Sequence, residues 1–237
     1  MILEKRVAVI TGATGALGEV ISRELAAHGA SLGLLDRNAE KLAALEKTLN
    51  LPNSRILVDS LDLLNPSETR SSAAGIAAKF GHIDILLHLV GGWTGGKTLL
   101  EATSEDIIFM LNQHVWTSFH VIQAFIPHML KNNWGRVIMV TSPFASRPTA
   151  KGGPYAIGKS GQEALILSLS QELKGTGVTA NLLQVKTIDA NREKVSTPSS
   201  ENATWSTPEE LATAILYLIS EEARGVNGAK IPMFGNY

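Results

Sequence analysis

Short apolar segments alternate with longer segments of helical spacing along the whole chain. Most of the apolar segments lack polar alternation, which is typical of parallel strands covered on both faces. We expect strands at residues 7–11, 31–35, 55–58, 84–90, 136–141, 178–183 and 229–233. Between them, apolar positions recur at helical spacing. We expect helices at residues 16–28, 38–49, 66–80, 104–131, 154–175 and 208–221.

Local signals support several of these helix boundaries. The segments Asn65–Glu68 and Thr207–Glu210 each combine a capping residue, a proline at the first helical position and a glutamate three residues after the cap. Gly29, Gly81 and Gly175 stand where helices are expected to stop.

Seven strands and six helices in alternation predict one α/β domain over residues 1–237. Its fold class is a single doubly wound Rossmann domain, with a seven-stranded parallel sheet flanked by helices. No linker-like stretch or internal repeat divides the chain. The polar, irregular segment 186–206 follows the sixth strand. We interpret it as a variable substrate loop over a site, because loops carry binding residues at the strand ends of such sheets.

Composition narrows the functional classes. With 44% hydrophobic residues the chain can bury a substantial core, and its net charge of −1 leaves no basic surplus for nucleic acid or a membrane surface. No apolar stretch approaches the ~18–20 residues that span a bilayer, and the N-terminus lacks a signal-peptide pattern. We therefore expect a cytoplasmic protein. With no cysteine and no paired histidine spacing, we expect no metal site.

A glycine-rich turn follows the first expected strand. Gly12, Gly15 and Gly18 have the spacing Gly-x-x-Gly-x-x-Gly and precede a helix. Such a turn lets the backbone and the helix N-terminus approach a pyrophosphate, although a tight turn without ligand has the same pattern. Asp36 ends the second strand, where an acidic group accepts hydrogen bonds from a ribose. This favours NAD as the cofactor, while the adjacent Arg37 leaves NADP possible.

A second glycine-rich segment offers a competing hypothesis. Residues Gly91–Thr98 match the P-loop pattern of nucleotide hydrolases and follow an expected strand. A P-loop opens directly into a helix, however, whereas Thr103–Asp106 has the pattern of a separate helix start. A P-loop NTPase is therefore the remote alternative, and a loop beside the cofactor is the simpler interpretation.

Four polar residues form a candidate catalytic set. Tyr155 and Lys159 are one helical turn apart, so both lie on one helix face. A nearby ammonium lowers the pKa of a tyrosine, which is otherwise a poor base at neutral pH. Ser142 ends the fifth strand, where its hydroxyl can bond a substrate carbonyl. Asn112 lies inside the long fourth helix.

These residues together resemble the short-chain dehydrogenase/reductase family over essentially the full chain. Asn112, Ser142, Tyr155 and Lys159 match its catalytic tetrad. The resemblance implies that Tyr155 is the acid/base, that Lys159 binds the nicotinamide ribose, that Ser142 orients the carbonyl and that Asn112 holds a relay water. Asp62 and Leu63 take the place of its adenine-contacting pair. The expected cofactor-binding residues are Gly12, Thr14, Gly15, Leu17, Gly18, Asp36, Arg37, Asp62, Leu63, Gly91, Tyr155, Lys159 and Thr187.

Three departures from the family pattern stand out. The glycine spacing is that of its longer members, His88–Gly91 replaces Asn-Asn-Ala-Gly, and Val185-Lys186 replaces Pro-Gly. The segment 187–192 and residues 205–208 are similar to dihydropteridine-reductase-like members, which suggests a flat, conjugated or heteroaromatic substrate.

Of the tryptophans, Trp116 and Trp134 are expected in the core, whereas Trp93 is expected beside the substrate pocket.

The resulting hypothesis is hydride transfer between NAD(P)(H) and a small carbonyl or secondary-alcohol compound. The alternative from another class is a sensor that binds the cofactor without turnover, which the altered Val185-Lys186 keeps open. The resemblance also implies a homodimer or homotetramer, formed through the helices at 104–131 and 154–175. The substrate and the physiological direction are left open by the sequence.

Overall fold

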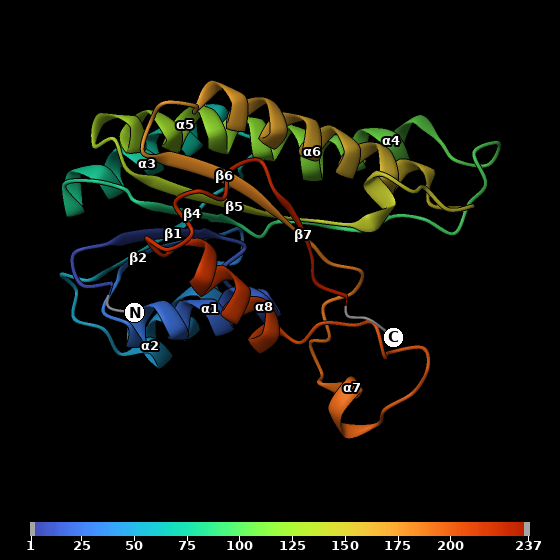
Figure 1. Cartoon of the computed structure of the whole chain (residues 1–237), viewed down its shortest axis with the longest axis horizontal. Helices are drawn as coiled ribbons and strands as arrows, with labels where there is room; N and C mark the ends of the chain where they lie inside the picture. Colours follow the sequence, from blue (N-terminus) through green and yellow to red (C-terminus); the bar gives the residue numbers. More distant parts are fainter. Residues whose placement is uncertain (1–2, 235–237) are drawn as a thin grey trace.

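A central parallel sheet of seven strands forms the middle layer of the computed structural model, which describes residues 3–234 (Figure 1). The strand order is β3-β2-β1-β4-β5-β6-β7, as expected for a doubly wound fold. The strands are β1 (Val7–Thr11), β2 (Ser31–Asp36), β3 (Ile56–Ser60), β4 (Ile85–His88), β5 (Gly135–Thr141), β6 (Val178–Gln184) and β7 (Lys230–Pro232).

Helices cover both faces of the sheet (Figure 1). On one face lie α1 (Ala16–Ala27), α2 (Ala39–Leu49) and α8 (Pro208–Leu218); on the other lie α3 (Pro66–Phe80), α5 (Thr117–Lys131) and α6 (Gly153–Glu172). Successive residues of β1 pack into different cores: Ala8 and Ile10 into one, Val7 and Val9 into the other. Burial on both faces explains the uninterrupted apolar strands, each large side chain contributing about 1.5–3 kcal/mol.

Two predicted helix starts have the expected side-chain caps in the structure. The Asn65 side chain accepts hydrogen bonds from the backbone N–H groups of Ser67 and Glu68, and Thr207 forms a capping box with Glu210. Gly81 ends α3 at φ 86°, a left-handed conformation that favours glycine.

The prediction of one regular helix at 104–131 is wrong in one respect. It divides into α4 (Ser104–Leu111), a π-helical segment (Asn112–Trp116) and α5. Within the π-helical segment the wider turn rotates the residues that follow relative to those before it. The expectation that Trp116 is in the core is also wrong, because its side chain is 49% exposed.

The expected irregular segment 186–206 contains a short helix, α7 (Glu193–Ser196), which lies apart from the sheet beside the start of α8 (Figure 1). Two ion pairs fasten it to α8: Arg192 with Glu209 at 2.6 Å and Lys194 with Glu210 at 2.9 Å. The buried Asp189 carboxylate accepts hydrogen bonds from the first backbone N–H groups of α7. The segment is therefore held to the domain at several points along its length.

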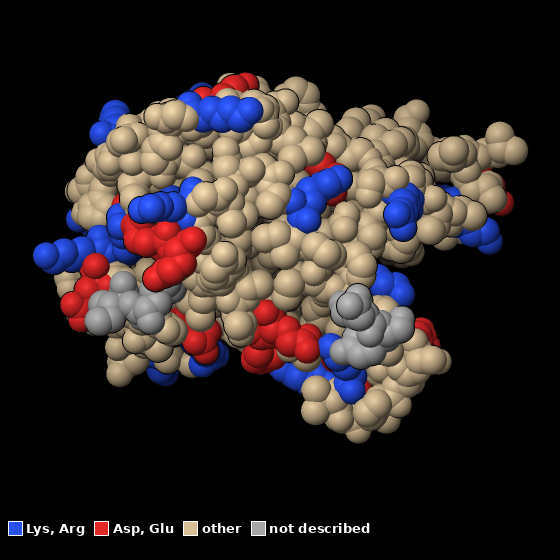
Figure 2. All heavy atoms as spheres, viewed as in Figure 1, with Lys and Arg blue, Asp and Glu red and all other residues tan. Residues whose placement is uncertain are grey.

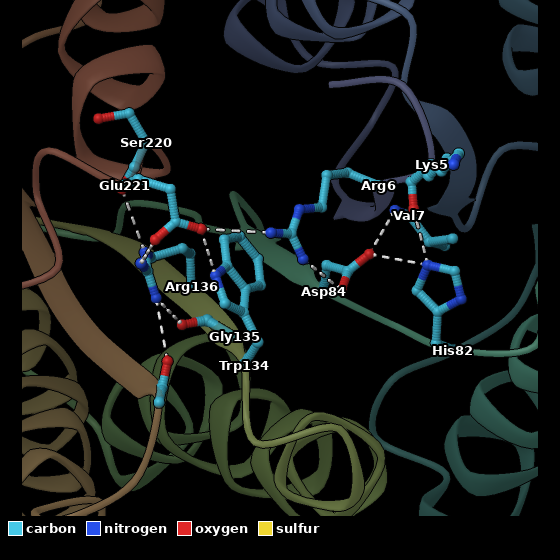
Figure 3. A network of polar contacts seen from close by, with 11 residues as sticks. Lys5, Arg6, Val7, His82, Asp84, Trp134, Gly135, Arg136, Ser220 and Glu221 are labelled. Atoms are coloured by element: carbon cyan, nitrogen blue, oxygen red, sulfur yellow. Dashed lines mark hydrogen bonds and ion pairs between the residues drawn. The ribbon is translucent and has the colours of Figure 1, made fainter. Parts of the chain in front are cut away.

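A polar network connects the amino ends of β1, β4 and β5 with the end of α8 (Figure 3). The Trp134 ring is contacted by two guanidinium groups, with Arg6 at 3.5 Å and Arg136 at 4.4 Å from its centre. The carboxylate of Glu221 pairs with both arginines and accepts a hydrogen bond from the Trp134 indole at 2.6 Å. This network lies at the sheet edge opposite the carboxyl ends of the strands.

The surface in Figure 2 carries basic and acidic side chains interspersed, without a large patch of one sign on that face. It is hollowed between the main body and the part that carries α7. Among residues 3–234, no helix combines the length and the apolar character needed to cross a membrane.

Candidate active site

Two adjoining cavities of about 300 Å³ each lie at the carboxyl ends of β1 and β4. Here the sheet order reverses, since β1 pairs with β2 on one side and β4 on the other. Ligands of open α/β sheets bind at such a reversal. We call the cavities outer and inner. They share five lining residues: Gly12, Gly15, Leu89, Val90 and Gly91.

The glycine turn separates the two cavities. A Cβ on Gly12, where φ is 71°, would lie 3.1 Å from the Val90 nitrogen, and one on Gly18 would lie 2.3 Å from the Gly12 carbonyl oxygen. Only glycine fits this close approach. Gly15 starts α1 without a side-chain cap, so no capping side chain occupies the first N–H groups of the helix. Such an uncapped helix N-terminus fits the pyrophosphate of a dinucleotide.

The outer cavity combines two acidic and two basic groups beyond the ends of β2 and β3. It is lined by Asp36, Arg37 and Lys41, together with Asp62 and Leu63. The Asp36 carboxylate is oriented by the glycine turn, because its Oδ2 accepts hydrogen bonds from the Thr14 hydroxyl at 2.8 Å and the Thr14 N–H at 3.1 Å. These groups suit the ribose and adenine of a nucleotide. The sequence reasoning missed Lys41, whose position in the first turn of the helix that follows Arg37 was the available signal.

The inner cavity contains the expected tyrosine and lysine, Tyr155 and Lys159, on the first turns of α6. Ser142, directly after β5, is buried and lines neither cavity. Burial raises the pKa of Tyr155, and the nearby Ser142 hydroxyl opposes this shift. The Tyr155 phenol is thus kept protonated in the free protein and lies beside a second hydroxyl.

Two neutral acceptors hold Lys159 in place. Its Nζ donates to the Val140 carbonyl at 2.7 Å and to Gln162 Oε1 at 2.9 Å. Burial lowers the pKa of Lys159 to about 7, while the nearby Glu163 carboxylate opposes this shift. Glu163 is itself bonded by the Thr141 hydroxyl at 3.0 Å and by Lys230 at 3.1 Å. The ammonium therefore titrates near neutrality.

The structure does not bring Asn112 into this group. Asn112 begins the π-helical segment and lines neither cavity. His114, two residues later, is buried, lines the inner cavity and packs edge-on against the Tyr155 ring, with 5.6 Å between the ring centres. His114 lies within the helix expected at residues 104–131, and a histidine that is buried there needs a polar partner.

All thirteen residues expected to bind the cofactor line one or both cavities. The P-loop alternative, in contrast, does not fit the geometry. Residues 91–103 form no helix, and Thr103 caps α4 as a separate start. The Lys97 ammonium binds the Asp106 carboxylate at 2.8 Å, so it is engaged with that helix start.

Comparisons with known proteins agree with this geometry. The short chain dehydrogenase family matches residues 6–200 of the chain. An uncharacterized oxidoreductase of Staphylococcus epidermidis is 29% identical over 92% of this chain and 93% of its own length. The D-beta-hydroxybutyrate dehydrogenase of Rhizobium meliloti is 27% identical over 98% of both chains.

Solved structures show the same fold. An NAD+-bound xylitol dehydrogenase superimposes with a TM-score of 0.89 at 20% identity, covering 99% of both chains. A levodione reductase superimposes with a TM-score of 0.87 at 22% identity, covering 98% of this chain and 97% of its own. The family match and the curated oxidoreductases establish that the chain belongs to the short-chain dehydrogenase/reductase family, as an NAD(P)-dependent oxidoreductase.

Proposed function

We propose that the protein transfers a hydride between NAD(H) and a small carbonyl or secondary-alcohol compound, with Tyr155 as the proton partner. One observation carries the proposal: Tyr155 and Lys159, one helical turn apart on α6, line the inner cavity, which adjoins the outer cavity that Asp36 lines. A nicotinamide cofactor, when bound, supplies or accepts the hydride.

In the direction of reduction, Tyr155 donates its phenolic proton to the carbonyl oxygen of the substrate. The Ser142 hydroxyl donates a hydrogen bond to the same oxygen and orients it. Because burial raises the pKa of Tyr155, the phenol is available as an acid. The Lys159 ammonium, held on Val140 and Gln162, stabilises the phenolate that remains. Oxidation follows the same path in reverse.

The residues of the outer cavity favour NAD over NADP. The Asp36 carboxylate, held by Thr14, accepts hydrogen bonds from ribose hydroxyls and repels a 2′-phosphate. We propose that segment 186–206 determines substrate specificity, because four of its residues line the inner cavity: Lys186, Thr187, Ile188 and Ala190. We propose a flat, conjugated or heteroaromatic substrate on the similarity of this segment to dihydropteridine-reductase-like members.

We also propose that the protein is a homodimer or homotetramer that assembles through α4, α5 and α6. Large apolar side chains are exposed on these helices and on the π-helical segment between α4 and α5, with Ile108 at 54%, Phe109 at 47%, Trp116 at 49% and Ile157 at 43%. Burying this area between subunits would remove apolar surface from water. Light scattering of the purified protein at several concentrations tests this assembly.

A sensor without turnover is the second candidate, because Val185-Lys186 stands where the family has Pro-Gly beside the inner cavity. The decisive experiment is a panel of carbonyl compounds with NADH and NADPH, comparing the wild type with Tyr155→Phe. We expect turnover by the wild type and a kcat lower by about 10²–10⁴-fold in the variant. Tight NADH binding without turnover on any compound would favour the sensor.

A further inference from the structure

We propose that Lys186 is a specificity-determining residue whose ammonium binds a carboxylate of the substrate, so that the carbonyl compound of this site is an oxo acid. The inference rests on the proposed function and names the substrate class of the same site. Lys186 belongs to the Val185-Lys186 pair that follows β6, where the family has Pro-Gly. A long cationic side chain at the glycine position is therefore particular to this chain.

Lys186 lies in the cavity where the proposed chemistry takes place. The Val185 N–H donates to the Thr141 carbonyl at 3.0 Å, which continues the pairing of β6 with β5 beyond the strand. The Val185 side chain is buried in the core that α1 and α8 cover, whereas Lys186 is exposed and lines the inner cavity. Tyr155 lines the same cavity, so the ammonium and the phenol face one ligand.

The inner cavity has a positive charge balance. Among the described residues that line it, none is acidic, and two carry an ammonium group, Lys159 and Lys186. The outer cavity differs, because two aspartates balance its two basic side chains. A cleft lined by charges of one sign raises the local concentration of ligands of the opposite sign. The inner cavity therefore favours an anionic substrate.

The Lys186 ammonium has a neutral partner. Its Nζ donates to the Thr204 hydroxyl at 2.9 Å, and no ion pair within the described part of the chain includes it. The carboxylate of Asp189, three residues later, accepts hydrogen bonds from the backbone N–H groups of Glu193 and Lys194 instead. An ammonium has three N–H donors, so Lys186 retains the capacity to bind a carboxylate.

The partner hydroxyl lies at a fixed point of the substrate loop 186–206. The Ser206 N–H donates to the Thr187 carbonyl at 3.0 Å and closes the base of the loop. Thr204 is two residues before this closure, so its bond holds the Lys186 side chain at the loop base beside the inner cavity. A side chain that is already held loses less conformational entropy when it binds a ligand.

Two anions compete for this assignment, the pyrophosphate of the cofactor and a carboxylate of the substrate. The pyrophosphate fits the glycine turn after β1, and β6 is three strand spacings from β1, or about 14 Å. In contrast, β5, which Ser142 follows directly, is one spacing of about 5 Å from β6. Lys186 is thus placed nearer to the reacting carbonyl than to the pyrophosphate, which favours the substrate carboxylate.

The proposed interaction has a distinct kinetic signature. Hydride transfer to the ketone leaves the carboxylate of an oxo acid unchanged. The bond from Lys186 is therefore equally strong in the bound substrate and in the transition state, and its loss raises KM while kcat stays nearly constant.

The test uses aryl oxo acids, which combine the flat, conjugated shape proposed above with a carboxylate. Benzoylformate, benzoylacetate and 3-benzoylpropionate place the carboxylate at three distances from the ketone, and the methyl ester of each removes only the charge. KM and kcat are measured with NADH, and the Kd for NADH is measured separately. Isothermal titration of each acid and ester into the NAD+-loaded protein, which cannot reduce them, gives their Kd values.

Four variants accompany the wild type. Lys186→Met retains the apolar stem and removes the ammonium, whereas Lys186→Arg retains a cation. Thr204→Val removes the neutral partner and leaves the ammonium. Lys174→Met is the matched control, because it makes the same change in net charge at an exposed position that lines neither cavity.

We expect the wild type to have a lower KM for at least one acid than for its ester. Lys186→Met should raise KM for that acid about 10–100-fold, the scale of a hydrogen bond to a charged group. The KM for the ester, kcat and the Kd for NADH should stay within about twofold. Lys186→Arg and Thr204→Val should retain most of the preference for the acid, and Lys174→Met should retain all of it.

Other outcomes would overturn the proposal. An equal rise in KM for acid and ester in Lys186→Met would assign the lysine to bracing the loop. A rise in the Kd for NADH would assign it to the pyrophosphate. If the wild type reduces each ester as readily as its acid and Tyr155→Phe reduces neither, the proposed function stands and this inference fails.

The titrations separate the two proposals when turnover is absent. If the wild type reduces none of the compounds, but its NAD+ complex binds an acid more tightly than the ester and Lys186→Met does not, the carboxylate site stands and the proposed hydride transfer fails for this class. If no acid binds more tightly than its ester, the carboxylate site fails regardless of turnover.

Discussion

The Asp36 carboxylate accepts a hydrogen bond from the hydroxyl of Thr14 at 2.8 Å, so the acidic group of the outer cavity is fixed by the glycine turn. Asp36→Asn retains an acceptor but removes the charge that repels a 2′-phosphate, while Arg37 and Lys41 remain to bind it. We expect kcat/KM for NADPH relative to NADH to rise about tenfold or more, equivalent to about 1.4 kcal/mol. Steady-state kinetics with both cofactors measures this ratio, with Arg37→Ala as the control that should lower it. An unchanged ratio in Asp36→Asn would contradict the assignment of this cavity.

His88 is expected to make the protein sensitive to acid. Its ring is fully buried on β4, with Nδ1 2.7 Å from the Thr11 hydroxyl. Burial and the charge of Lys159 lower the pKa of His88 from 6.5 to about 3. Between these two values the unfolded chain binds one more proton than the folded protein, so the free energy of unfolding falls as the pH falls.

The variant His88→Asn removes this titration. The slope of unfolding free energy against pH, measured by urea denaturation between pH 6.5 and 4, should become shallower by about 1.4 kcal/mol per pH unit. Equal slopes in wild type and His88→Asn would show that the ring is not neutral in the folded protein.

Gly18 is expected to tolerate no side chain. In Gly18→Ala the new Cβ would lie 2.3 Å from the Gly12 carbonyl oxygen, so the glycine turn must move. We expect the Kd for NADH to increase at least about tenfold. Gly75→Ala in α3 is the matched control, because nothing lies within 4 Å of its Cβ. There, binding should be unchanged, and stability should rise by about 0.5–1 kcal/mol through helix propensity. Isothermal titration with NADH compares the two; equal affinities would disprove the role of this turn.

Arg136 is expected to stabilise the network in Figure 3. Its side chain is 2% exposed and donates to the carbonyl oxygens of Gly135 at 2.8 Å and Gly177 at 3.1 Å. Arg136→Met leaves these acceptors without that donor, so we expect a loss of about 2–4 kcal/mol in urea unfolding. Glu221→Gln, at an exposed carboxylate, should cost less than about 1 kcal/mol. A larger loss in Glu221→Gln than in Arg136→Met would reverse this ranking.

Sequence reasoning was most successful where local chemistry and two-sided burial agree. The seven strands were predicted because their residues enter a core on each face, as in β1, and the capped helix starts at Asn65 and Thr207 were readable from four residues each. Tyr155 and Lys159 line the same cavity, as their spacing of one regular helical turn predicts. The thirteen expected cofactor residues line the cavities because the glycine turn and the strand ends fix their positions.

The parts that were missed depend on contacts far apart in the chain. The π-helical segment 112–116 is indistinguishable from a regular helix in its spacing of apolar residues, so neither the segment nor the position of His114 on the inner cavity was predicted. Helix α7 has four residues and little apolar content. It is held by Asp189 and by partners at the start of α8, which the local sequence does not reveal.

The stack of Trp134 between two guanidinium groups gives the protein an optical reporter at the sheet edge remote from the cleft. Trp93 is 64% exposed and directly follows Gly91 and Gly92, which line the inner cavity, so it can serve as a second reporter. In a background with Trp116 and Trp205 replaced by phenylalanine, emission from Trp93 would follow nucleotide binding, while emission from Trp134 would change only when the amino-end edge unfolds. The rate of nucleotide binding and the rate of unfolding of the sheet could then be measured separately in a single stopped-flow trace.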